Sequence, residues 1–337
     1  MQAIFAVTVP FFALVLLGWL GARSRVLPES AIPGLNAYVL YFALPCMLFR
    51  FGSSLPIERL ADPSLLGVYL FCAVAVVAVT VLVTLRRGGA GPGSGSGVDL
   101  RDAAFGALVA AFPNAGFMGV PLLVALLGEA AAGPVIGAIV VDLVVTSTLC
   151  LALAQADTRQ RGGTHGDRSL LRGALASLRG ALTNPLPWAI ASGAAFGATP
   201  FVLAAPLAQI VRMLGDSATP VALFTIGAVL FRAGRHVHTR TPVAHYLPVA
   251  LIKLLLHPAL VFGAGLAARA LGAPVSSFGL MALTLTAALP SESNAALLAE
   301  RFGADNGRIT RIIMASTVLA FASFSACAWL FGIGRTG

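Results

Sequence analysis

Three ionisable side chains, Asp142, Lys253 and Glu292, lie deep inside long apolar stretches of the sequence. Charged groups are expensive at such depth in lipid, and those that persist commonly serve as proton relays, ion ligands or counter-ions. We therefore take all three as candidates for coupling to a proton or a sodium ion. Structural alternatives stay open, since Asp142 could be a hydrogen-bonded structural carboxylate and Lys253 could extend toward a membrane interface.

Two apolar stretches, around 112–122 and 289–295, are interrupted by proline and polar residues. Proline removes a backbone donor and clashes with the preceding turn, so each helix should break there. If the breaks cross, helix N-termini with free N–H groups meet at one point, which suits a carboxylate. The predicted substrate-binding residues are Pro113, Asn114, Gly116, Pro290, Ser291, Glu292, Ser293 and Asn294. The alternative is a pair of structural kinks, in which Asn and Ser cap the freed backbone groups.

The composition indicates that lipid surrounds the elements that carry these residues. Of 337 residues, 58% are hydrophobic and 10% are charged, against roughly 25% charged in soluble domains. Stretches of about 20 apolar residues predict an all-α membrane protein with ten helices. They are 3–20, 31–51, 65–85, 103–127, 133–154, 183–199, 204–231, 243–270, 276–300 and 308–331.

The net charge is +9, and the basic residues that produce it are unevenly distributed among the connections between these helices. Of the 22 basic residues, 16 fall in alternate connections and only four in the remaining connections and the C-terminus. Basic residues concentrate on the cytoplasmic side of membrane proteins. We therefore predict a multi-pass protein of the inner (plasma) membrane with both termini outside, and no nucleic-acid partner.

An internal repeat relates the two halves of the chain. At an offset of 175 residues, Pro10 falls on Pro185 and Gly18 on Gly193. The same offset places Pro45 on Pro220 and Gly52 on Gly227. Five helices per half force the second half to enter the membrane from the opposite side, as in many secondary transporters. The predicted organisation is a first repeat (1–154), a cytoplasmic linker (155–182) and a second repeat (183–337).

Other classes of function lack their motifs. The sequence contains no Gly-x-x-x-x-Gly-Lys-Ser/Thr, His-Glu-x-x-His or Gly-x-Ser-x-Gly string, which argues against a nucleotide-driven pump or an enzyme. His236 and His238 lack neighbouring acidic or Cys ligands, so we expect no metal and no cofactor. Arg212 and Asp216 have i,i+4 spacing and are predicted to form a structural ion pair.

Several strings resemble the auxin efflux carrier family, which includes bacterial proteins described as malonate transporters. They are 42–49 (FALPCMLF), 113–122 (PNAGFMGVPL), 252–258 (IKLLLHP) and the Leu289–Pro290 pair. The resemblance spans essentially the whole chain. It implies two inverted five-helix repeats with broken, crossing helices 4 and 9, a fold similar to bile-acid sodium symporters. It also implies that Asn114 and the crossing of Pro113 with Pro290 contact a substrate carboxylate.

We therefore expect a secondary active transporter of small organic anions, auxin-like or dicarboxylate, that works by elevator-type alternating access. The alternative is a sodium-coupled organic-anion symporter of the bile-acid type. The expected partners are a small carboxylate, the lipid bilayer and a second copy of the chain, packed through helices one, two, six and seven. The family more often has a small or neutral residue at the position of Glu292, and we expect this carboxyl group to couple transport to protons.

Overall fold

The computed structural model describes residues 2–54, 62–87, 98–160, 185–235, 241–293 and 295–333. Within these ranges every regular element is a helix, and the β-type pairing is a single isolated bridge between Pro113 and Ser291. The predicted all-α class is thus confirmed for this part of the chain. Most of the predicted linker, the pair His236 and His238, and Asn294 lie outside the described residues.

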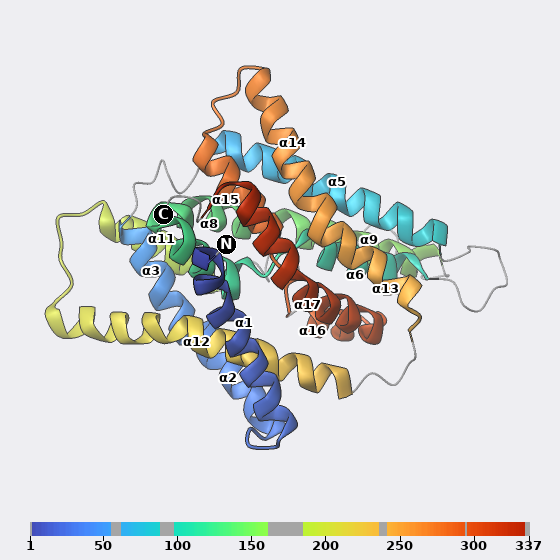
Figure 1. Ribbon diagram of the computed structural model, residues 1–337, viewed down its shortest axis with the longest axis horizontal. Coiled ribbons are helices and arrows are strands. Elements are labelled where there is room, and N and C mark those ends of the chain that lie inside the picture. The colour runs from blue at the N-terminus through green and yellow to red at the C-terminus, as the bar shows by residue number, and fades with distance from the viewer. Residues whose placement is uncertain are drawn as a thin grey trace.

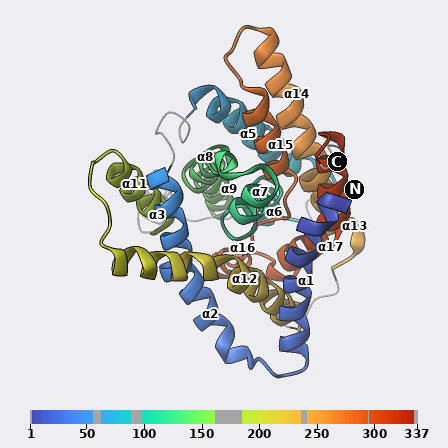
Figure 2. The same cartoon turned by 60° about the vertical axis from the view of Figure 1, so that its left-hand side comes forward.

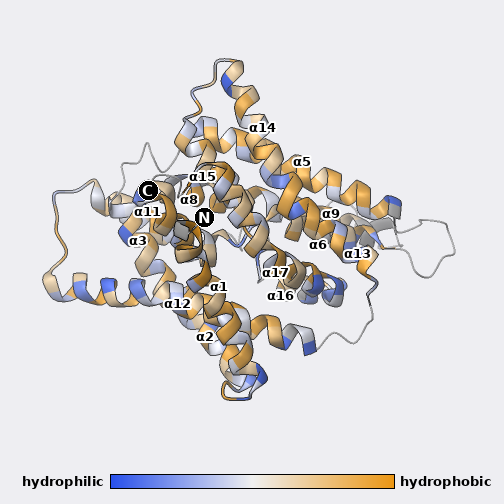
Figure 3. Cartoon of the chain, in the orientation of Figure 1, coloured by the Kyte–Doolittle hydropathy of each residue, from blue (hydrophilic) through white to orange (hydrophobic). Residues whose placement is uncertain are grey.

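In the part of the chain that the structure describes, seven helical stretches are long and apolar enough to cross a membrane, as expected of a multi-pass membrane protein. They are α1 (Gln2–Arg23), α2 (Ile32–Tyr38) continuing through Val39–Ala43 into α3 (Leu44–Ser54), α5 (Pro63–Arg87), α8 (Ala132–Val141) continuing through Asp142–Thr146 into α9 (Ser147–Gln160), α12 (Ala205–Arg235), α13 (Val243–Leu251) continuing through Ile252–Leu256 into α14 (His257–Ala270), and α17 (Asn306–Leu330). Apolar residues run along all of them in Figure 3.

The other three predicted stretches contain shorter helices. These are α11 (Pro185–Gly197), α6 (Leu100–Ala111) with α7 (Val120–Leu127), and α15 (Ser277–Ala287) with α16 (Ala295–Arg301). The α6–α7 pair and the α15–α16 pair are each interrupted at the position where proline predicted a break. Ten membrane crossings remain a prediction, because among the described residues seven stretches have spanning length in one helix.

Side-chain caps explain where several helices begin. Asp99 accepts a hydrogen bond from the backbone N–H of Asp102 at 2.8 Å, and Ser276 accepts one from Gly279 at 3.0 Å. Such caps satisfy N–H groups that have no partner within the helix. The starts of α6 and α15 are therefore encoded locally, by an Asp and a Ser in the sequence.

One group of helices, which we call the first helix group, contains α1, α2, α3, α11 and α12. These helices occupy the lower left of Figure 1. A Cβ atom at Gly18 of α1 would collide with the carbonyl oxygen of Phe224 in α12. In the same way, a Cβ at Gly193 of α11 would collide with the carbonyl of Phe49 in α3. Glycine therefore permits backbone contact between helices, as small residues do in membrane proteins generally.

The predicted pairing of Arg212 with Asp216 is wrong. Asp216 of α12 instead accepts a hydrogen bond from Arg50 of α3, with 2.6 Å between the nitrogen and the oxygen. Because α3 packs against α12, this partner from a distant part of the chain reaches the carboxylate. The i,i+4 spacing of two residues on one helix could not reveal a competitor on another helix.

The second helix group contains α5 to α9 and α13 to α17. In Figure 2, α7, α8 and α9 lie at the centre, between α3 and α11 on one side and α14 and α15 on the other. Arg308 of α17 is buried and ties this group together at one end. Its guanidinium donates to the carbonyl oxygens of His245 and Asp102, each at 2.9 Å, and to Thr84 at 3.4 Å. Although Arg308 lies at the very start of a predicted apolar stretch, the structure buries it between α17 and three other helices, α5, α6 and α13.

Candidate functional site

The two helix interruptions meet and hydrogen-bond to one another. Helix α6 ends at Ala111, and Phe112 has extended backbone angles (φ −89°, ψ 105°), as expected for a residue before proline. The backbone N–H of Asn114 donates to the carbonyl of Pro290 at 2.8 Å, and that of Glu292 donates to the carbonyl of Phe112 at 3.0 Å. Backbone groups freed by the broken helices thus satisfy one another, as an apolar interior requires.

Asn114 leads from this crossing into the next helix. Its backbone carbonyl accepts hydrogen bonds from Met118 at 3.1 Å and Gly119 at 3.0 Å, which starts the wide turn of Ala115–Gly119 before α7. Its side chain is 2% exposed, and the Oδ1 atom has no hydrogen-bond partner among the described residues. The side chain therefore does not act as the structural cap that the kink interpretation requires. Its amide is available to a bound molecule, as a donor or an acceptor according to its orientation.

Ser291 hydrogen-bonds to a neighbouring helix. Its backbone N–H donates to the hydroxyl of Ser316 in α17 at 3.2 Å, and the two hydroxyls are 3.1 Å apart. Ser316 also donates to the carbonyl of Ile313 at 2.9 Å. These bonds fasten the second interruption to α17, and substrate binding by Ser291 stays a prediction. Ser293 is also buried, at 6% exposure.

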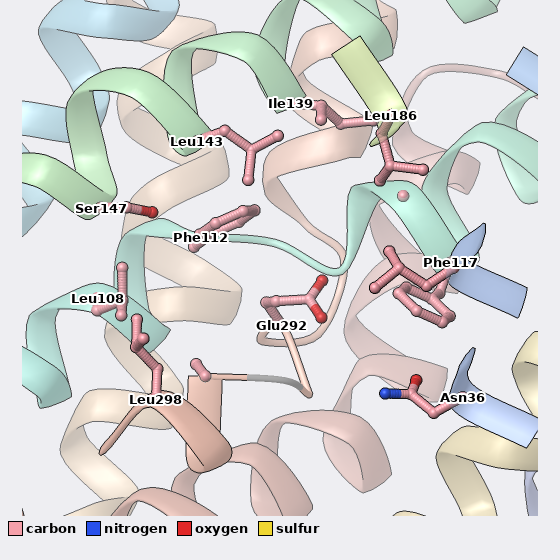
Figure 4. Close-up of a pocket in the computed structure, with 13 residues that line it drawn as sticks. Asn36, Leu108, Phe112, Phe117, Ile139, Leu143, Ser147, Leu186, Glu292 and Leu298 are labelled. Carbon is pink, nitrogen blue, oxygen red and sulfur yellow. The ribbon is translucent and has the colours of Figure 1, made fainter. Parts of the chain in front are cut away.

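A cavity of about 410 Å³ opens beside the crossing (Figure 4). This volume lies within the range of small-molecule binding sites, which are typically about 300–1,000 Å³. Of the predicted site residues, Gly116 and Glu292 line it. The full lining is Asn36, Leu40, Leu108, Phe112, Gly116, Phe117, Ile139, Leu143, Ser147, Leu186, Glu292, Ala295 and Leu298. Leu40 and Leu186 belong to the first helix group, so the cavity lies between the two groups.

Polar groups converge on this apolar cavity from three segments. The Glu292 carboxyl group points into it, and Asn36 of α2 and Ser147 of α9 approach from other sides. The sequence singled out Glu292 but not the apolar wall formed by residues such as Phe112 and Phe117. An apolar residue facing a cavity has the same sequence signature as one facing lipid, and no pattern could have separated them.

Asp142 lies behind the cavity rather than in its lining. Its carboxylate accepts hydrogen bonds from the Tyr69 hydroxyl of α5 and from the Thr146 hydroxyl, each at 2.8 Å. Asp142 opens a π-helical turn, and the Ser147 hydroxyl donates to its backbone carbonyl at 2.9 Å. Such turns are frequent at functional sites because they rotate one helix face against the next. The hydrogen-bonded structural interpretation of Asp142 therefore holds, and its part in ion coupling stays a prediction.

Lys253 is fully buried and does not extend toward an interface. Its Nζ atom donates to the carbonyl of Ala287 at 2.9 Å and lies 3.1 Å from Nδ1 of His257. Ala287 is the last residue of α15, immediately before the second interruption. Lys253 therefore supports the crossing from behind and does not line the cavity.

A second cavity, of about 400 Å³, lies beyond the crossing along α7. Pro121 and Val124 of α7 line it, together with Arg50 and Asp216 of the first helix group. The first cavity is lined by the end of α6, whereas the second is lined by α7, so they flank the interruption on opposite sides. No cluster of three His, Cys, Asp or Glu side chains suited to a metal ion occurs in the described residues.

Comparison with known proteins gives one family and one similar relative. Residues 3–329 match the family described as membrane transport protein. A protein of Rhizobium meliloti (strain 1021) named "Putative malonate transporter" is 27% identical over 337 residues, covering 99% of this chain and 98% of the relative. The resemblance drawn from the sequence motifs is therefore confirmed, and both findings indicate a membrane transporter rather than an enzyme.

Proposed function

We propose that this chain, which belongs to the membrane transport protein family, is a secondary active transporter of small organic carboxylates that works by alternating access. The observation that carries the proposal is the crossing of the two interruptions beside the 410 Å³ cavity. Broken helices that meet at a cavity are the usual binding architecture of secondary transporters. Asn114 contributes a buried side-chain amide at this point, and we propose that the N–H of this amide donates a hydrogen bond to the substrate's carboxylate.

The two cavities support alternation between two faces. Each lies on its own side of the crossing, and each is lined by residues of both helix groups. A movement of the second helix group along the first, as in an elevator, closes one cavity and enlarges the other. The glycine contacts inside the first group keep that group rigid, which suits it to be the stationary partner.

An inverted repeat is supported by contacts that the 175-residue offset relates. Gly18 packs on Phe224, and the equivalent residues, Gly193 and Phe49, pack in the same way. An offset that recurs in tertiary contacts, and not only in sequence landmarks, favours two halves of common architecture. On this basis we propose ten crossings in two five-helix repeats, similar to the bile-acid sodium symporters.

The substrate class rests on the helix ends at the crossing and on the relative's name. Helix N-termini favour a carboxylate through the positive end of their dipole, and the Rhizobium relative is named for malonate. Glu292 faces the same cavity. The negative charges of an anionic substrate and of the Glu292 carboxylate repel one another unless a proton is shared between them. We therefore propose proton coupling through Glu292, with Asp142 supporting it.

Topology and assembly are proposed from charge and apolar exposure. The distribution of basic residues favours both termini on the outer side of the inner (plasma) membrane. Large apolar side chains remain exposed on α11 and α12, including Trp188, Ile210 and Met213. This face suits either lipid or a second copy of the chain, and we propose a homodimer through the first helix group.

Uptake into proteoliposomes tests the proposed function. Radiolabelled malonate and indole-3-acetate are each offered under an imposed proton or sodium gradient, with protein-free liposomes as the control. We expect saturable uptake of at least one carboxylate, driven by the proton gradient. Uptake driven only by sodium would favour the symporter alternative, and no uptake by protein that reconstitutes intact would refute a carboxylate carrier.

A further inference from the structure

The substrate cavity contains a carboxyl group and no basic side chain. Among the described residues that line it, Glu292 is the ionisable one, and its carboxyl group points into the space (Figure 4). None of these lining residues is an arginine, a lysine or a histidine, and the others are apolar except for Asn36 and Ser147. A substrate that adds negative charge here meets repulsion and no counter-charge in the cavity wall.

The Glu292 carboxylate is suited to a positively charged group on the ligand. An ionised carboxylate is an acceptor with about four lone-pair sites, so its contacts within the protein leave capacity for a donor from a bound molecule. Hydrogen bonds from an ammonium group to a carboxylate are roughly twice as strong as those between neutral groups. Glu292 is 9% exposed and shares the cavity with apolar residues such as Phe112 and Leu143, where opposite charges attract more strongly than in water.

A residue with the opposite preference belongs to the same junction. Pro113 and Ser291 form the bridge between the two interruptions, and Asn114 and Glu292 directly follow them in the chain. The backbone hydrogen bonds on either side of this bridge are donated by Asn114 and Glu292, so one pairing fixes both residues. The Asn114 amide can donate to a carboxylate, whereas an ionised Glu292 can only accept. A donor and an acceptor at one junction match a ligand that carries a carboxylate and an ammonium group on the same carbon atom.

We propose that the preferred substrates are zwitterionic α-amino acids with an apolar side chain, whose ammonium group binds the Glu292 carboxylate. This inference rests on the proposed carboxylate transport and specifies its substrate class. The ligand's carboxylate binds at Asn114, and its apolar side chain packs on walls that include Phe117 and Ile139. The ammonium group supplies the positive charge that an anionic substrate obtains only by sharing a proton. A zwitterion therefore leaves the net charge of the cavity unchanged, whereas an anion makes it more negative.

Binding of three matched ligands to the purified protein in detergent tests this proposal. L-Leucine, 4-methylpentanoate and 3-methylbutylamine share one hydrocarbon chain and carry both charged groups, the carboxylate alone or the ammonium group alone. In calorimetric titrations near neutral pH, we expect wild type to bind L-leucine roughly 10- to 100-fold more tightly than either other ligand, because each of these lacks one hydrogen bond to a charged group. In Glu292→Gln the affinity for L-leucine should fall by a similar factor, while the affinity for 4-methylpentanoate stays the same or rises.

A control variant and the ligand series separate the outcomes. Glu300→Gln removes an exposed carboxylate on α16 and should keep the ligand preference of wild type. Wild type that binds L-leucine no more tightly than 4-methylpentanoate, or a folded Glu292→Gln that keeps the preference for L-leucine, would overturn the proposal. If Glu292→Gln fails to fold, the ranking of the three ligands by wild type still decides. Uptake of malonate or indole-3-acetate by a protein that does not prefer L-leucine would refute this inference alone and leave the proposed function in place.

Discussion

The backbone N–H of Asn114 donates to the carbonyl oxygen of Pro290, 2.8 Å away, although 176 residues separate them in the chain. This bond holds the first interruption against the second and places the Asn114 amide at their junction. Because the bond is made by the backbone, a substitution of the side chain leaves it in place. The amide can therefore be removed without dismantling the crossing.

We expect Asn114→Ala to abolish saturable carboxylate uptake while the protein stays folded. The buried amide supplies a hydrogen bond to the carboxylate, and losing a hydrogen bond to a charged group costs about 1.5–3 kcal/mol, a factor of roughly 10 to 150 in affinity. Uptake into proteoliposomes and Tm in detergent are measured together. Asn306→Ala, at the start of α17, is the matched control and should retain uptake. Full uptake by Asn114→Ala would remove this residue from the site.

Glu292→Gln should separate transport from the proton gradient. The amide keeps the size of the side chain and the backbone bond to Phe112, but it can no longer exchange a proton with the cavity. We expect uptake that persists and no longer accelerates when the inside is made alkaline. Glu300→Gln changes an exposed carboxylate on α16 and should behave as wild type. An unaltered pH dependence in Glu292→Gln would contradict proton coupling at this residue.

Gly18→Ala should destabilise the protein, because its new methyl group collides with the carbonyl of Phe224. Overpacking of this kind typically costs about 1–3 kcal/mol. Gly193→Ala should lower Tm similarly, since its methyl group meets the carbonyl of Phe49. At Gly263 of α14 a Cβ meets no atom within 4 Å, so Gly263→Ala should be neutral or raise Tm through helix propensity. Equal Tm values for Gly18→Ala and Gly263→Ala would argue against the close helix contact.

Arg308→Lys should be strongly destabilising although it preserves the charge. The guanidinium contacts Thr84, Asp102 and His245 on three other helices, and a lysine cannot reproduce its planar arrangement of donors. Leaving a buried carbonyl without its donor costs about 1–3 kcal/mol. The measurement is Tm in detergent, with the exposed Arg212→Lys as the control. A Tm within about 1 °C of wild type would mean that the arginine contacts contribute little.

Single cysteines should report the two cavities from opposite sides of the membrane. In a cysteine-free background, Ser147→Cys lies in the first cavity and Val124→Cys in the second. With the proposed topology, a membrane-impermeant thiol reagent should label Val124→Cys from outside and Ser147→Cys only when added to the cytoplasmic face. Labelling of both positions from the same side would contradict alternating access with this topology.

The sequence by itself determined the class of protein and where its helices break. Ten apolar stretches and a scarcity of charge require lipid around helices, and proline at 113 and 290 removes backbone donors wherever the chain goes. The family was equally readable, because the motif around Asn114 is contiguous in the chain. These are local properties, and each is determined by neighbouring residues.

Only the tertiary structure decided which residues meet. Pairing of Asp216 with Arg50, burial of Arg308 and contact of Lys253 with Ala287 all depend on helices distant in sequence. The apolar wall of the cavity, including Phe112 and Leu186, was also beyond reach of the sequence. The type of a hydrophobic residue does not indicate whether its side chain faces lipid, the protein core or a cavity. Packing alone assigns its surroundings, because dispersion and burial are not directional.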